Sequence, residues 1–250
     1  MAQHAADTDS LVQLRGVNKH VGMVQVLNGI DLDLARGEVV AVLGPPGSGT
    51  STLCRAISGT ERIDSGRITV DGQQLPRRRR EQAGIRAAAG IGVGLVGRPY
   101  GFTGHRTALE NVASGRFRWW DAATPPGARR RARALLERVG AAGHAAGYPA
   151  ELDQEQQQLV ATARALAGDP KLVLFDQPTP ALPPELARSL AADGLGVLLA
   201  TDDPRLARAA ADRVVFMDGG RILEQSAPTE FFTVPRTARA RDFLARTPKD

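Results

Sequence analysis

Hydrophobic and polar residues alternate in the first part of the chain, and this pattern predicts antiparallel strands. The alternation runs over residues 11–17 and 26–34, as in strands that are covered on one face only. Residues 66–70 predict a further strand, closed by a turn at Asp71 and Gly72. A hairpin is predicted near the C-terminus, with strands at residues 213–217 and 222–224 on either side of the turn Asp218, Gly219 and Gly220.

Later segments predict a parallel sheet and several helices. Residues 38–43 form a short β-branched run, and residues 172–175 and 197–200 are apolar throughout, which is typical of parallel strands covered on both faces. Helices are predicted at residues 51–58, 108–113, 128–139, 154–167 and 186–194. We therefore expect an α/β fold that begins with an antiparallel β subdomain and contains an inserted helical subdomain.

Composition and charge indicate a globular protein of one or two lobes. The chain has 250 residues, of which 42% are hydrophobic and 24% charged. Its net charge of +5 is compatible with an acidic partner. The arginine runs at residues 77–80 and 129–133 are interpreted as solvated faces. Only residues 116–120 interleave arginine with aromatic side chains, so nucleic-acid binding is disfavoured.

The chain shows no targeting segment, no disulfide framework and no histidine-based metal site. It begins MAQHAADTDS, without the basic start and apolar run of a signal peptide or an anchor, so membrane association is expected only through a partner. The single cysteine, Cys54, suits the cytoplasm and is interpreted as a small core residue. The histidines have no ligand spacing; they are His4, His20, His105 and His144.

The segment VLGPPGSGTST, residues 42–52, carries the strongest candidate chemistry. Gly44, Gly49 and Ser51 match the phosphate-binding pattern G-x-x-x-x-G-K-[ST], but Thr50 stands where the pattern has lysine. A predicted strand precedes the segment and a predicted helix follows it, which is the context that such a loop requires. The sequence therefore predicts a phosphate-binding loop without its cation.

Three segments, in order, resemble the nucleotide-binding subunit of ABC transporters, specifically the polar amino acid uptake type. They are GPPGSGTST, ELDQEQQQLVATARALAGDPKLVLFDQPTPAL and DRVVFMDGGRILE, and the resemblance covers nearly the whole chain. It implies a P-loop NTPase fold of the ABC type, forming a single domain over residues 1–250. The implied parts are a RecA-like core at residues 1–96 and 160–230, a helical subdomain at about 97–159 and a C-terminal tail at 231–250.

The resemblance assigns the nucleotide to the glycine loop. The nucleotide-binding positions are Gly44, Pro45, Pro46, Gly47, Ser48, Gly49, Thr50, Ser51 and Thr52. Backbone N–H groups remain to hold phosphate, and Ser51 and Asp176 are the positions for Mg²⁺. In the family a lysine at position 50 holds the β- and γ-phosphates. Its charge-assisted hydrogen bond is worth about 1.5 to 3 kcal/mol, so we expect ATP and Mg²⁺ to bind weakly.

No catalytic residue of the family is intact. Gln177 follows Asp176 where the family has its catalytic glutamate, and an amide cannot accept a proton at neutral pH. The switch histidine corresponds to Asp202, a negative group where the γ-phosphate would lie. The glutamine that couples the site to the permease aligns best with Arg98. The degenerate catalytic positions are thus Thr50, Arg98, Gln177 and Asp202.

The family signature L-S-G-G-Q is also replaced. It corresponds to Leu152, Asp153, Gln154, Glu155 and Gln156. Asp153 and Gln156 have the spacing of a capping box, so the following helix is expected to start well. A carboxylate about 8 Å from a phosphate would oppose it by about 2 kcal/mol at an effective dielectric of about 20. The substitutions therefore favour folding over phosphate binding.

Three further positions depart from the family. The aspartate of the D-loop is Pro183, and the aromatic residue that stacks on adenine corresponds to Val21, with His20 beside it. The helix at residues 186–194 is about seven residues shorter than in the family, close to two turns.

These changes predict a pseudo-ATPase, since the scaffold motifs are retained while nearly every side chain that would touch nucleotide has changed. Such a subunit is expected to be cytoplasmic and to dock on membrane permease subunits at the inner face of the cell membrane. Phe102, Trp119 and Trp120 are candidates for the docking surface, or else for the core of the helical subdomain. As a homodimer, or as a heterodimer with another ABC ATPase, the chain would impair both composite ATP sites.

Two alternatives stay open at the level of sequence. One is an active ATPase that energises amino acid import and uses Arg98 in place of the missing lysine. The other is a nucleotide- or anion-sensing module that uses the loop at 44–52 and Asp176 with Mg²⁺. Turnover would indicate the first, and tight binding without turnover the second.

Overall fold

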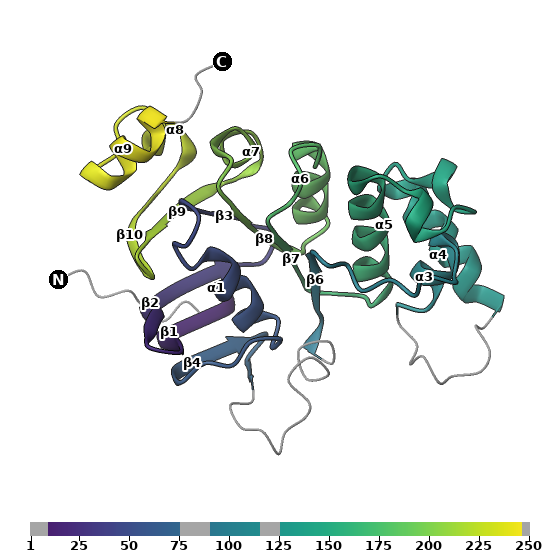
Figure 1. The fold of residues 1–250 in the computed structure, drawn as a ribbon, viewed down its shortest axis with the longest axis horizontal. Coiled ribbons are helices and arrows are strands. Elements are labelled where there is room, and N and C mark those ends of the chain that lie inside the picture. Colours follow the sequence, from purple (N-terminus) through teal and green to yellow (C-terminus); the bar gives the residue numbers. More distant parts are fainter. Residues whose placement is uncertain (1–9, 76–90, 116–125, 247–250) are drawn as a thin grey trace.

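The computed structural model describes residues 10–75, 91–115 and 126–246, which form two sheets and a group of helices (Figure 1). The smaller sheet contains four strands in the order β2-β1-β4-β5. These strands are β1 (Ser10–Val21), β2 (Val24–Ala35), β4 (Ser65–Val70) and β5 (Gln73–Gln74). The pairs β1–β2 and β1–β4 are antiparallel, which confirms the prediction from the alternating pattern.

The larger sheet has six strands and provides the scaffold for the candidate site. They are β3 (Val39–Leu43), β6 (Val93–Gly97), β7 (Leu172–Asp176), β8 (Gly196–Thr201), β9 (Arg213–Asp218) and β10 (Arg221–Ser226), in the order β10-β9-β3-β8-β7-β6. All neighbours are parallel except the β9–β10 hairpin. Every residue of β3, β7 and β8 is buried, as their continuous apolar runs predict.

Strand β6 is not predicted by the sequence pattern, because glycine weakens strand propensity. Its glycines allow the neighbouring elements to approach closely. A Cβ on Gly94 would lie 3.2 Å from the Cβ of Ala165, and a Cβ on Gly97 would lie 3.0 Å from the Cβ of Asp176. Gly94 and Gly97 thus weaken the strand pattern in the sequence but allow close packing of β6 in the structure.

Helices cover both faces of the larger sheet. One face is covered by α1 (Thr50–Ile57) and the smaller sheet, and the other by α6 (Pro184–Ala192) and α7 (Pro204–Ala210) (Figure 1). Strand β3 divides its side chains between these two layers: Val40 and Val42 join the core on the α1 side, while Val39, Ala41 and Leu43 join the core on the other side.

A separate group of helices packs together beyond the β6 edge of the sheet (Figure 1). It contains α3 (Ala108–Ala113), α4 (Pro126–Arg138) and α5 (Gln154–Ala167), and two single 3₁₀ turns, Ala142–His144 and Pro149–Glu151, lie between α4 and α5. Helices α3 and α5 have the predicted bounds. Helix α6 begins at Pro184 instead of residue 186, because a proline fits the first helical position.

The short helices near the C-terminus are not predicted by the sequence pattern, and neither is α7. They are α8 (Pro228–Phe231) and α9 (Ala238–Arg246). Helix α9 buries Ala240, and the ring of Phe243 lies 5.4 Å from that of Phe216 in β9. Among the residues that the structure describes, no helix combines the length and the hydropathy needed to cross a bilayer.

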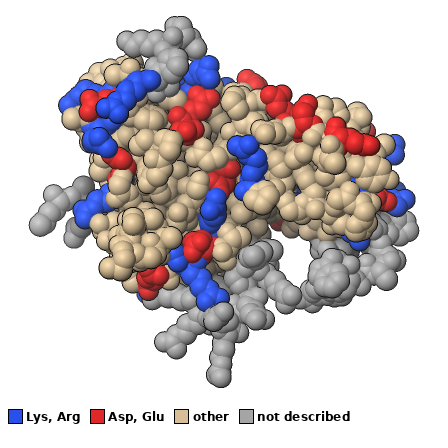
Figure 2. Space-filling model, in the orientation of Figure 1, with Lys and Arg blue, Asp and Glu red and all other residues tan. Residues whose placement is uncertain are grey.

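The arginines of α4 are largely neutralised by neighbouring carboxylates. Figure 2 shows positive and negative side chains interspersed over the face drawn. The predicted solvated segment at 77–80 and the mixed arginine and aromatic segment at 116–120 lie outside the described residues. The ion pairs of α4 are Arg129 with Glu110, Arg131 with Asp169 and Arg138 with Asp193.

Candidate functional site

The parallel strands bring most of the predicted site positions to one edge of the sheet. Leu43 of β3 is level with Thr201 of β8, and Asp176 of β7 is level with both Ala200 and Gly97. The residues that directly follow these strand ends are Gly44, Arg98, Gln177 and Asp202. Because the carboxyl ends of parallel strands form the usual ligand-binding edge of an open α/β sheet, this edge is the candidate site.

The glycine loop between β3 and α1 leaves the N-terminus of the helix open. Gly47 and Gly49 adopt positive φ angles of 84° and 99°, and the amide of Ser48 donates to the carbonyl of Pro45 at 3.0 Å. Gly49 is the N-cap of α1 and provides no side-chain cap. The backbone N–H groups of the first turn therefore stay available to an anion, with the positive end of the helix dipole behind them.

Main-chain contacts from two other segments hold this loop in place. The amide of Gly220, in the β9–β10 turn, donates to the carbonyl of Ser48 at 3.1 Å. A Cβ on Gly49 would lie 2.5 Å from the carbonyl oxygen of Val26, and one on Gly44 would lie 2.3 Å from that of Met217. The loop shape thus depends on backbone packing that excludes any larger residue at these two glycines.

Asp176 lies almost completely buried at the end of β7. Its side chain is 5% exposed, and its Oδ2 accepts a hydrogen bond from Nε of Arg55 at 3.1 Å. Its Oδ1 is buried and finds no hydrogen-bond partner among the described residues, and the same is true of the Oγ of Ser48 in the loop. A buried, unpartnered carboxylate oxygen is a suitable ligand atom for Mg²⁺. These residues therefore fit a phosphate group and one carboxylate contact to a metal, although the loop itself has no cation.

Cys54, a residue of α1, is fully buried, in agreement with its interpretation as a core residue. Burial raises the pKa of its thiol well above the usual value, and the negative charge of Asp176 raises that pKa further. The thiol is thus held in its neutral, unreactive form.

Gln177 is held in a strained backbone conformation directly after Asp176. Its φ angle is 51°, in the left-handed region, and its amide donates to the carbonyl of Ala200 at 2.9 Å. The following loop is fixed by α5, because the amide of Thr179 donates to Oε1 of the buried Gln158 at 2.6 Å. The structure thus positions residue 177 firmly, but its amide offers no base for activating water.

The N-terminus of α5, at the expected signature position, is capped by its own side chains. Asp153 Oδ1 accepts from the amide of Gln156 at 2.8 Å, and Gln156 Oε1 accepts from the amide of Asp153 at 3.1 Å. The predicted capping box is therefore confirmed. Arg98 donates from Nη1 to Oε1 of Gln154 at 3.2 Å, so its guanidinium is directed to this helix.

Sequence reasoning missed a second arginine that holds the segment after β6. Arg164 of α5 donates to the carbonyl of Gly101 at 3.0 Å and to that of Tyr100, and its guanidinium lies 4.8 Å from the ring centre of Phe102. Burial lowers the pKa of Arg164. Phe102 packs against the helical group, in agreement with the core interpretation of this residue. Trp119 and Trp120 lie outside the described residues.

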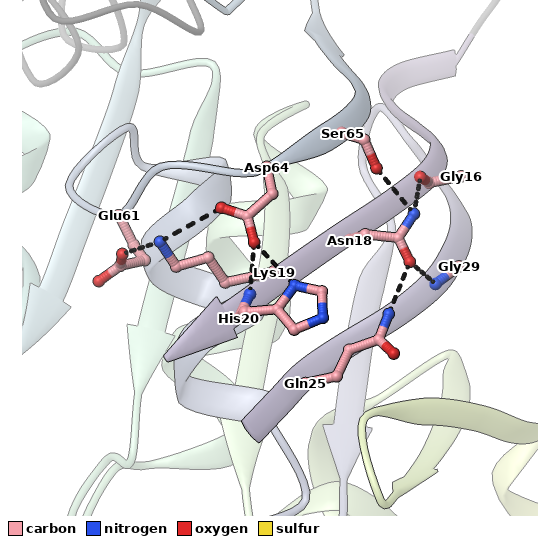
Figure 3. A network of polar contacts seen from close by, with 9 residues as sticks. All are labelled: Gly16, Asn18, Lys19, His20, Gln25, Gly29, Glu61, Asp64 and Ser65. Carbon is pink, nitrogen blue, oxygen red and sulfur yellow. Dashed lines mark hydrogen bonds and ion pairs between the residues drawn. The ribbon is translucent and has the colours of Figure 1, made fainter. Parts of the chain in front are cut away.

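Figure 3 shows the polar network around His20, near the predicted adenine position. Asp64 Oδ2 accepts from the backbone amide of His20 at 2.6 Å and lies 3.0 Å from its Nδ1. The hydrogen bond from the His20 side chain is the main cause of the lowered pKa of Asp64. Lys19 adds an ion pair with Glu61 at 2.8 Å. Val21, the residue expected at the adenine position, is 57% exposed.

The remaining predicted positions lie at the starts of α6 and α7. Pro183 is the N-cap of α6 and provides no side-chain cap. Asp202 is exposed after β8, whereas its neighbour Asp203 caps α7 by accepting from the amide of Arg205 at 2.9 Å. In residues 10–75, 91–115 and 126–246, no three His, Cys, Asp or Glu side chains come together as a metal-binding group.

Comparisons with known proteins place this geometry in a family. Residues 27–180 match the family described as ABC transporter. The chain is 43% identical to the glutamate transport ATP-binding protein GluA of Corynebacterium glutamicum, over 94% of this chain and 98% of that protein. It is 40% identical to the glutamate/aspartate import ATP-binding protein GltL of Escherichia coli K12, over 94% and 99% of the two chains.

Similarity to solved structures supports the same family at the level of the fold. The dimeric structure of MJ0796, a bacterial ABC transporter cassette, matches with a TM-score of 0.78 and 28% identity, over 87% of this chain and 98% of that one. The predicted fold class, a P-loop NTPase of the ABC type, is confirmed. By its sequence, its sheet order and its glycine loop, the chain belongs to the ABC transporter family of ATP-binding subunits.

Proposed function

We propose that this protein is an ATP-binding subunit of an amino acid import system that hydrolyses ATP little or not at all. The observation that carries this proposal is Gln177, held at the end of β7 where the family has its catalytic glutamate. Because its amide does not take up a proton at neutral pH, the attacking water has no general base there. The amino acid class rests on the names of the relatives, which are glutamate transport and glutamate/aspartate import proteins.

Two further features support loss of hydrolysis. Thr50, the first residue of α1, brings no charge to the loop, so a γ-phosphate lacks the lysine that would stabilise its transition state. Asp153 takes the amide of Gln156 in the first turn of α5, a helix start that in the family is offered to the nucleotide of the opposing subunit. A dimer built from this chain, with itself or with another ABC ATPase, would therefore have both composite sites impaired. The nucleotide-binding residues 44–52 and the subdomain boundaries remain part of this proposal.

The alternative of an active ATPase is less well supported. It requires Arg98 to replace the missing lysine, yet the Arg98 guanidinium is directed to Gln154 at the start of α5. A subunit that does not hydrolyse ATP can still bind a membrane permease at its cytoplasmic docking surface. We propose this scaffold role at the inner face of the membrane.

Phosphate release by the purified chain tests the proposal, with Thr50→Lys, Gln177→Glu and the double variant measured alongside. Parent turnover should stay below about one per minute, since a working enzyme of this kind turns over far faster. Thr50→Lys should tighten binding of labelled ATP by about 10- to 100-fold without turnover, because it restores one charge-assisted hydrogen bond.

Asp176→Asn is the matched control for contaminating activity. Parent turnover that Asp176→Asn abolishes would overturn the proposal. Recovery of turnover by Thr50→Lys alone would show that the missing lysine, and not Gln177, is the dominant defect. Tight ATP binding by the parent without turnover would instead favour the sensing module.

A further inference from the structure

The ion pair between Arg55 and Asp176 joins a half-exposed side chain to a buried one. Asp176 is 5% exposed and Arg55 is 50% exposed, and Nε of Arg55 lies 3.1 Å from Oδ2. Arg55 stands in the last turn of α1, which packs over β7. The half-exposed Arg55 side chain therefore reaches a buried carboxylate at the end of β7.

Charge explains why this contact forms. A buried carboxylate is unstable unless a cation or several donors compensate it. Residues 44–52 contain no lysine or arginine, Gln177 is neutral and Asp202 is acidic. Arg55 thus provides the compensation at Asp176.

We propose that Arg55 competes with a divalent cation for Asp176, so that the nucleotide-free protein binds such a cation weakly. Oδ1 of Asp176 is still free to bind an ion. However, a divalent cation there would lie beside the guanidinium on Oδ2, and the two positive charges repel each other. Metal binding therefore requires Arg55 to leave. The inference rests on the proposed function, since a subunit that does not hydrolyse ATP has no need of a catalytic metal.

Binding of Mn²⁺ alone to the nucleotide-free protein, measured by electron paramagnetic resonance, tests this competition. Arg55→Gln removes the charge and keeps a side-chain donor for Oδ2, so this variant should fold and should bind Mn²⁺ at least about tenfold more tightly than the parent. Arg55→Lys keeps the charge and should behave like the parent. Adding Asp176→Asn to Arg55→Gln should abolish the gain.

Arg62→Ala serves as the matched control, because Arg62 is an exposed arginine just beyond α1. It should leave Mn²⁺ binding unchanged, and urea unfolding of each variant shows that it is folded. Equal Mn²⁺ binding by the parent and Arg55→Gln would overturn the inference, as would a gain that survives Asp176→Asn. Phosphate release by the same parent sample is a separate readout: turnover there overturns the proposed function, whatever the Mn²⁺ result.

Discussion

Helices α1 and α5 begin in opposite ways, although the family uses the N-termini of both for phosphate. Helix α1 starts at Gly49 without a side-chain cap, whereas α5 starts at Asp153 with a complete capping box. At α1 the loss of lysine removes a charge but leaves the backbone donors in place. At α5 the Asp153 carboxylate accepts from the amide of Gln156, and the Gln156 side chain accepts from the amide of Asp153. The start of α1 therefore leaves its backbone donors uncapped, whereas the start of α5 uses two amides in its own cap.

The largest expected effect is that of Gly49→Ala, which changes the uncapped start of α1. The new Cβ would lie 2.5 Å from the carbonyl oxygen of Val26, and the φ angle of 99° is unfavourable for any residue but glycine. We expect the free energy of unfolding in urea to fall by about 3 kcal/mol, from backbone strain together with overpacking.

Gly47→Ala is the matched control for Gly49→Ala. Gly47 also has a positive φ angle, of 84°, but a Cβ there meets no atom within 4 Å. It should lose only about 1 kcal/mol. Equal losses at the two positions would contradict the role of the Val26 contact in holding the loop.

An intermediate effect is expected for Asp153→Ala, which opens the start of α5. It removes the acceptor for the amide of Gln156 and should lower the free energy of unfolding by about 1 kcal/mol. Asp153→Asn keeps a good cap and should stay within about 0.5 kcal/mol of the parent in the same urea titration. If both variants unfold like the parent, the capping box does not stabilise α5.

The smallest effect concerns the polar network beyond the far end of α1. The pKa of Asp64 is lowered, chiefly by the His20 side chain, so its contribution to stability is present above the unfolded pKa of about 3.9 and is lost as the pH falls through the folded value. Asp64→Asn should lower stability at pH 7 by less than about 1 kcal/mol, because the pair is exposed.

Urea midpoints at pH 7, 5 and 3 measure this difference between the parent and Asp64→Asn. The difference should shrink at pH 3, where the parent carboxylate begins to protonate. A difference that does not change with pH would mean that Asp64 acts through packing and not through its charge.

The fold was largely predictable because its patterns are local. The start of α5 follows from its capping box, and the bounds of α3 follow from a stretch without internal proline or glycine. The buried strands β3, β7 and β8 follow from their apolar runs. Strand β6 was not predictable, because its glycines are explained only by the close approach of Ala165 and Asp176, residues far away in the sequence.

The candidate site was predictable in its residue types but not in its contacts. The missing lysine at position 50, the amide of Gln177 and the cap at Asp153 follow directly from the residue types in the sequence. The partners of Arg55, Arg98 and Arg164 are not, because each guanidinium reaches a residue at least 56 positions away. The contacts of long flexible side chains leave no periodic pattern in the sequence, so their partners are known only from the folded structure.

The main-chain contacts of the glycine loop have a consequence for exchanges of its side chains. Since Gly220 and the carbonyl of Val26 fix the outline of the loop, exchanging its side chains alters what it binds without altering its shape. A side-chain exchange such as one at Thr50 is therefore expected to change nucleotide binding while the backbone of the loop keeps its outline.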